Sequence, residues 1–131
     1  MSLPGVRGVP ALAVLAGAML LAACAASRPA PRAADYELVP GARARLADGS
    51  SLAYTRLLSD SRCPPDVTCI HAGWAEAELV HARGAAPGQA FVLSTRPGGE
   101  AFETGGWRFE LLELGRGASP PAAIRITRRA N

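Results

Sequence analysis

From Asp35 to the C-terminus, apolar residues recur at every second position in short runs, and turn-forming residues separate the runs. This alternation favours β-strands with one buried face, and no stretch of the domain shows sustained helical periodicity. The runs cover residues 42–46, 52–58, 73–81, 89–94, 107–111 and 124–127, with a further edge strand at 36–39. We therefore expect residues 35–131 to form an all-β domain, an antiparallel sandwich or small barrel of about six to seven strands.

The parity of each run predicts which side chains form the core. In the run 73–81 the inward residues are Ala75, Ala77 and Leu79, and Glu76 and Glu78 lie on the opposite face. The inward residues of the last two runs are Trp107, Phe109, Leu111, Ile124 and Ile126. Asp48-Gly49 follows the first run and suits the positive φ angles of a tight hairpin turn.

The first 23 residues have the layout of a secretion signal. Arg7 supplies the basic start, Ala11–Leu21 is a short uncharged apolar run, and small residues precede Cys24. A membrane span needs about 20 apolar residues. Because this run is much shorter, we predict that residues 1–23 are removed on export and do not stay as a transmembrane helix.

The residues before the cleavage point, Leu21-Ala22-Ala23-Cys24, resemble the lipobox of bacterial lipoproteins. The resemblance implies that Cys24 becomes the first residue, with a diacylglyceryl group on its sulfur and an acyl chain on its amine. Several such chains anchor a protein permanently, because each buried methylene contributes about 0.8 kcal/mol. Ala25 follows, in place of the Asp that retains Gram-negative lipoproteins at the inner membrane. If the cell is Gram-negative, this implies an outer-membrane location facing the periplasm. An ordinary signal with an incidental Cys24 is the alternative.

Residues 24–34 are expected to form a tether between the anchor and the domain. The segment is rich in alanine, contains Pro29 and Pro31, and has no strand pattern. Proline-rich linkers are extended at roughly 3 Å per residue, so the tether would hold the domain clear of the membrane.

Cys63 and Cys69 remain as a pair once Cys24 is acylated. Export places them in an oxidising compartment, where an even number of cysteines indicates a disulfide. Redox catalysis would favour a C-x-x-C spacing at the start of a helix, whereas these cysteines are separated by five residues in a proline-rich loop. A structural disulfide that fixes the loop between two strands is therefore the prediction.

The loop also carries a motif. The segment 60–75 resembles the pattern D-S-R-C-P-x-x-V-x-C-[IV]-W-A-G-x-A of small bacterial exported and lipoprotein-type proteins with no established activity. The matching residues are Asp60, Ser61, Arg62, Cys63, Pro64, Val67, Cys69, Ile70, Ala72, Gly73 and Ala75. His71 departs from the pattern, which has Trp there, and Trp74 follows three residues later. The resemblance supports the disulfide and the β fold, and it implies no mechanism.

Long strand connections often carry binding surfaces, so this loop is the candidate binding site. Its candidate residues are Asp60, Arg62, Asp66, His71 and Trp74. Asp60 beside Arg62 is typical of turn and ion-pair chemistry. Trp74 shares its parity with Glu76, which places it on the outer face, either as a ligand contact or packed against the loop.

Composition and motifs narrow the range of possible functions. The net charge is +3, and the basic residues, all arginine, are interleaved with acids, which does not favour nucleic-acid binding. No G-x-S-x-G elbow or other catalytic arrangement is evident, so hydrolysis is a remote alternative and no cofactor is expected. We expect a lipid-anchored envelope protein that binds a partner or has a structural role. The alternative is metal binding or sensing by His71 and nearby acids, although His71 and His81, both expected to be partly exposed, are a distant pair.

Overall fold

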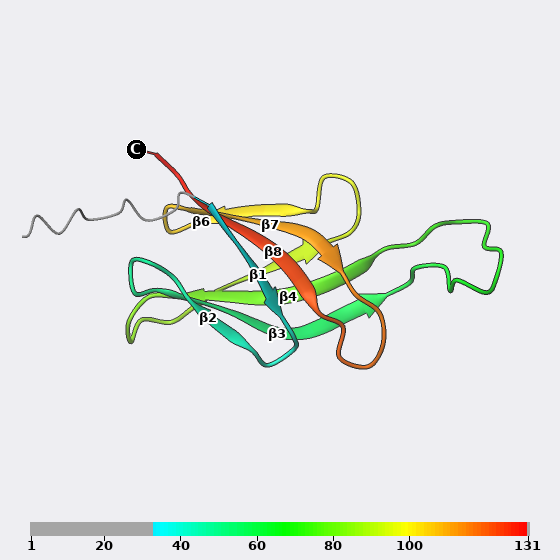
Figure 1. Cartoon of the computed structure of the whole chain (residues 1–131), viewed down its shortest axis with the longest axis horizontal. Helices are drawn as coiled ribbons and strands as arrows, with labels where there is room; N and C mark the ends of the chain where they lie inside the picture. Colours follow the sequence, from blue (N-terminus) through cyan, green and yellow to red (C-terminus); the bar gives the residue numbers. More distant parts are fainter. Residues whose placement is uncertain (1–32, 131) are drawn as a thin grey trace, which may run out of the picture.

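The computed structural model describes residues 33–130, which form two antiparallel four-stranded sheets packed face to face (Figure 1). The strands are β1 (Ala33–Leu38), β2 (Arg43–Arg45), β3 (Ser51–Asp60), β4 (Ala75–Ala82), β5 (Gln89–Ser94), β6 (Ala101–Thr104), β7 (Trp107–Leu114) and β8 (Ala122–Arg128). The first sheet has the order β1-β8-β7-β6 and the second β2-β3-β4-β5. The expected antiparallel sandwich is confirmed. The described part of the chain contains no helix able to span a membrane.

The number of strands and several strand bounds differ from the sequence prediction. The structure has eight strands, because the short strand β6 was not expected. β1 begins at Ala33, so two residues assigned to the tether pair with Thr127 and Ile126 of β8 instead. The predicted signal, Cys24 and the rest of the tether lie outside the described residues.

Strand parity predicts the core well. The side chains predicted to face inward on β4, β7 and β8 are all buried. They meet Leu52, Tyr54, Phe91 and Leu93 of the second sheet, and Phe91 stacks between Phe102 and Phe109 with ring centroids 4.6 and 5.3 Å away. All core residues lie between Leu38 and Ile126, so the sandwich closes without residues 1–32.

The chain enters the sandwich at one end, and its longest strand connection projects from the other. β1 begins beside the end of β8, where Ala33 pairs with Thr127, so the chain enters the sandwich near its C-terminus. The β3–β4 connection projects from the opposite end (Figure 1). β3 contains register shifts between Tyr54 and Arg56 and between Leu57 and Ser59. Such bulges bend and twist a strand, and they lie just before the projecting segment.

Candidate functional site

The projecting segment is residues 61–74, which we call the finger (Figure 1). Its base continues the β3–β4 ladder, since the Ser61 N–H donates to the Trp74 carbonyl (2.9 Å) and the Cys63 N–H to the Ala72 carbonyl (3.0 Å). Further out, a disulfide joins Cys63 and Cys69, whose Cα atoms are 5.8 Å apart. The predicted disulfide is present, and it closes the tip of a hydrogen-bonded hairpin.

Gly73 allows the two sides of the finger to approach each other. Its φ is +66°, and a Cβ added there would lie 1.8 Å from the carbonyl oxygen of Ser61. A side chain at this position is incompatible with the paired base for both steric and conformational reasons. The glycine of the sequence motif therefore has a structural role.

Arg62 fixes the base of the finger to the first sheet. Its guanidinium donates to both carboxylate oxygens of Asp60, at 2.9 and 2.6 Å, and to the carbonyls of Leu114 (2.5 Å) and Gly115 (2.6 Å). Its side chain is only 13% exposed. The hydrogen bonds from Arg62 lower the pKa of Asp60 to about 2. Two of the candidate binding residues, Asp60 and Arg62, therefore hold the finger in place, as ion-pair chemistry predicted, and are not free for a ligand.

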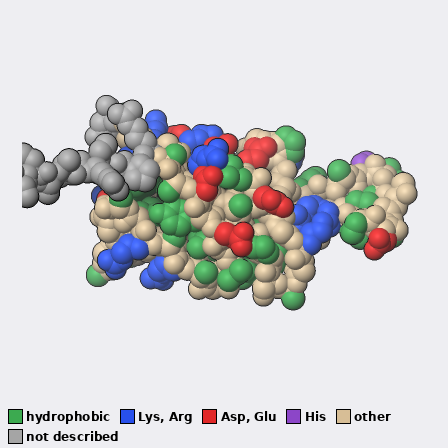
Figure 2. Space-filling model, viewed as in Figure 1, with side chains coloured by type: hydrophobic (Ala, Val, Ile, Leu, Met, Phe, Trp, Pro, Cys, Tyr) green, Lys and Arg blue, Asp and Glu red, His purple; other side chains and the backbone are tan. Residues whose placement is uncertain are grey.

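The tip of the finger exposes apolar side chains to solvent. Ile70 is 95% exposed and Val67 56%, and Pro64 and Pro65 beside them are also exposed. The candidate Asp66 lies at the same tip and is exposed. Figure 2 shows the finger as an extension made mostly of apolar and uncharged atoms. The tip is therefore an apolar surface with little charge.

A shallow open groove lies where the finger meets the sandwich. It is lined by Ser61, His71, Ala72, Gly73, Trp74, Arg96 and Pro97. The Arg96 guanidinium lies over the Trp74 indole, 4.9 Å from the ring centroid, and no carboxylate among residues 33–130 pairs with it. Trp74, on the outer face as parity indicated, is 39% exposed, and the exposed His71 lines the same groove. The structure thus brings two of the candidate residues, His71 and Trp74, together.

The expectation that His81 is partly exposed is wrong. It is 6% exposed because it shares the inward parity of Ala75, Ala77 and Leu79 on β4, a signal the sequence already contained. It therefore lies in the sandwich core, while His71 lies on the finger. No group of three or more His, Cys, Asp or Glu side chains suited to a metal occurs within residues 33–130.

Sequence reasoning also missed a polar cluster around Asp48. Its carboxylate accepts hydrogen bonds from the Ser50 N–H (3.0 Å) and hydroxyl (2.5 Å), from the Trp107 indole (3.0 Å) and from Arg83 (2.9 Å). Burial alone would raise the pKa of Asp48, but hydrogen bonds from Ser50 and Trp107 and the charge of Arg83 outweigh it and lower that pKa. In the sequence, the only sign of this cluster was the turn predicted at Asp48-Gly49, which accounts for the hydrogen bond from the Ser50 N–H to Asp48.

Ser50 and His81 form a pair that resembles a nucleophile with its base, since His81 Nε2 lies 3.0 Å from the Ser50 hydroxyl oxygen. The hydroxyl proton is committed to the Asp48 carboxylate, so Nε2 must carry a proton and donate. Ser50 is also completely buried. The arrangement is a hydrogen-bonded part of the core and offers no reactive group to a substrate.

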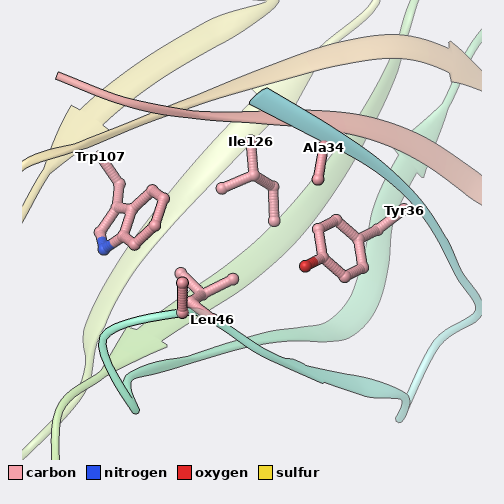
Figure 3. Close-up of a pocket in the computed structure, with 6 residues that line it drawn as sticks. Ala34, Tyr36, Leu46, Trp107 and Ile126 are labelled. Atoms are coloured by element: carbon pink, nitrogen blue, oxygen red, sulfur yellow. The ribbon is translucent and has the colours of Figure 1, made fainter. Parts of the chain in front are cut away.

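One further hollow opens between β1 and the segment after β2. Ala34, Tyr36, Leu46, Ala47, Trp107 and Ile126 line it (Figure 3). Its volume of about 60 Å³ is well below the roughly 300 Å³ of the smallest usual ligand pockets. The finger with its groove is therefore a better candidate site than this hollow.

Comparison of the chain with models of protein families, with curated proteins and with solved structures gave no match. The sequence motifs and the geometry of the site are therefore the basis for a function. The resemblances of Leu21–Cys24 and of residues 60–75 to lipoprotein sequences stay predictions.

Proposed function

We propose that the chain is a lipid-anchored protein of the bacterial cell envelope, and that its sandwich is a non-catalytic module that binds another envelope protein through the finger. The lipobox-like residues Leu21–Cys24 support the anchor. An oxidising compartment also suits the Cys63–Cys69 disulfide.

The observation that carries the binding role is the exposure of Ile70. Full burial of such a side chain is worth roughly 1.5–3 kcal/mol, and at 95% exposure nearly all of it is still available to a partner. Other exposed large apolar residues on the sandwich body, such as Val92 at 44%, keep more of their surface covered. The finger therefore presents the least covered apolar side chain among those described.

The finger is also preorganised for binding. The disulfide, the paired base and the Arg62 contacts to Leu114 and Gly115 restrict its conformations before a partner arrives. Restraint of this kind lowers the entropy lost on association. Trp74 and Arg96, which border the groove, are residue types enriched at interface hot spots. Together these features favour recognition of a protein surface that accepts an apolar tip.

Site-specific photo-crosslinking in producing cells tests this function. A photoreactive amino acid replaces Ile70 in one variant and the exposed Val92 of β5 in the control. We expect a discrete crosslinked product from position 70 that is lost when Cys63 and Cys69 are both replaced by Ser, and none from position 92. Equal crosslinking from both positions, or none from position 70, would contradict the proposal.

The serine double variant needs its own check, because the finger lies outside the core. The small ring contributes only about 2 kcal/mol on the chain-entropy model, so the sandwich should remain folded. Circular dichroism and thermal unfolding would verify this before the crosslinking result is interpreted.

A further inference from the structure

The end of the sandwich where the chain enters is rich in arginine, and we call it the entry end. It is built from the turns around Asp48-Gly49, Gly84 and Gly105-Gly106 and from the end of β8. Its arginines are Arg43, Arg45, Arg83, Arg128 and Arg129, and its acids are Asp48 and Glu103. Arg108 and Glu110 are also close and pair with each other, so together they leave the net charge of this end unchanged. The entry end therefore carries an excess of positive charge.

Contacts link these residues into one region. Arg83 and Arg128 both pair with Asp48, and Arg83 also donates to the Gly105 carbonyl at 3.2 Å. Arg129 pairs with Glu103. Arg43 and Arg45 line one hollow together with Gly49, Ser51, Ala82 and Gly84, which places them beside the same turns.

Arg43 and Arg45 carry the unbalanced charge. They are exposed on β2, on either side of the buried Ala44, so their side chains share one face. No carboxylate among the described residues pairs with either of them. Charges on an edge strand such as β2 also prevent edge-to-edge aggregation, which is the competing explanation.

The position of this end relative to the anchor favours a membrane. Eight residues, 25–32, separate Cys24 from Ala33, and an extended chain spans at most about 3.5 Å per residue. Ala33 pairs with Thr127, next to Arg128, so the anchored chain reaches the sandwich at its arginine-rich end. The finger projects from the other end (Figure 1).

We propose that the entry end lies against the headgroups of an anionic lipid bilayer, through Arg43 and Arg45 above all, and thereby directs the finger away from the membrane. This inference rests on the proposed lipid anchor and adds a second, electrostatic contact to it. Basic groups near an anionic surface attract it within about one Debye length, roughly 8 Å at physiological salt. The short linker keeps the entry end close enough to the bilayer for this attraction to act.

Vesicle binding by residues 25–131, which lack the acylated cysteine, tests the surface separately from the anchor. The core lies between Leu38 and Ile126, so this chain retains the whole sandwich. We compare sedimentation with vesicles of phosphatidylcholine alone and with vesicles containing about one-third phosphatidylglycerol. Binding is expected only to the anionic vesicles, and it should decrease as salt is raised.

A matched pair of double variants distinguishes an effect of the entry end on vesicle binding from an effect of the net charge. Replacing Arg43 and Arg45 with Gln should weaken partitioning by about twenty-five-fold, because each arginine near the surface contributes about fivefold. The control replaces Arg56 and Arg116 with Gln, which removes the same charge outside the entry end and should alter partitioning less than about twofold. Equal binding to both kinds of vesicle, or equal losses in the two variants, would overturn the proposal and leave edge protection as the role of Arg43 and Arg45.

The two tryptophans of the chain report the orientation, because Trp107 contacts Asp48 at the entry end and Trp74 lies at the base of the finger. On anionic vesicles with nitroxide-labelled headgroups, Trp74→Phe isolates Trp107 and Trp107→Phe isolates Trp74. We expect stronger quenching of Trp107. Stronger quenching of Trp74 would show that the finger faces the bilayer and would overturn the proposal. If Trp107→Phe does not fold, Trp74 quenching is obtained as the difference between wild type and Trp74→Phe.

Discussion

At the scale of single residues, Tyr54 leaves a polar group unsatisfied in the core. Its hydroxyl is buried with no hydrogen-bond partner within residues 33–130, and burial raises the pKa of the phenol. A buried, unbonded hydroxyl costs free energy, and removing it without changing the packing is close to neutral or stabilising. We therefore expect Tyr54→Phe to leave the free energy of unfolding unchanged or to raise it by up to about 1 kcal/mol in urea unfolding. A decrease of more than about 1 kcal/mol would show that the hydroxyl is bonded.

His81 makes the stability depend on pH. Burial lowers the pKa of its imidazole, the charge of Asp48 opposes this change, and Arg83 adds to it. The unfolded chain therefore binds a proton at a higher pH than the folded chain does. The contribution of the neutral ring is complete above about pH 6.5, the usual histidine pKa, and is lost as pH falls through the lower folded pKa.

His81→Gln tests this linkage, because its amide nitrogen can still donate to Ser50 but does not titrate. We expect the variant to have a flatter profile of unfolding free energy below pH 6.5, measured by denaturant titration at a series of pH values. Asp60 titrates near pH 2, so its effect falls in a lower range and serves as an internal reference. Identical profiles for the variant and the wild type between pH 5 and 6.5 would disprove the role of His81.

At the scale of elements, the alternation of apolar and polar residues in the sequence correctly predicted most of the strands. The run 89–94 corresponds to β5 without change, while β3 extends beyond its predicted run at both ends. β6 was missed because its four residues are too short to show a clear period and its Phe102 is only half-buried. The shape of the finger could not be predicted, since it depends on contacts between Arg62 and Leu114, which are distant in sequence.

The substitution Gly73→Ala tests whether the paired base of the finger depends on a glycine. Gly73→Ala places a Cβ against the Ser61 carbonyl and should separate the paired base. Gly84 has a similar positive φ, but a Cβ added there meets no atom within 4 Å. We expect Gly73→Ala to accelerate hydrogen exchange of the Ser61 and Cys63 amides at least about tenfold, because local opening exposes them. Gly84→Ala should leave both amides unchanged. Unchanged exchange in Gly73→Ala would show that the finger tolerates a side chain there.

At the scale of the whole molecule, the sandwich separates two surfaces. The arginine-rich entry end lies beside Ala33, where the linker begins, and the finger with Ile70 lies at the other end. An anchored domain with this arrangement would contact lipid at one end and a partner protein at the other. Neither surface requires a change in the core between them, so each can be tested without unfolding the domain.

The anchor itself is tested by Cys24→Ala in the full-length chain. Loss of the acylated sulfur removes the hydrophobic attachment, so the protein should leave the membrane fraction after a high-salt wash, which also disrupts electrostatic contact of the entry end. The released protein should unfold at the temperature of the folded domain, because its core lies between Leu38 and Ile126. The Cys63→Ser, Cys69→Ser double variant should stay in the membrane fraction as a control for cysteine loss. Membrane attachment of Cys24→Ala that persists through the wash would show that Cys24 is not the anchor.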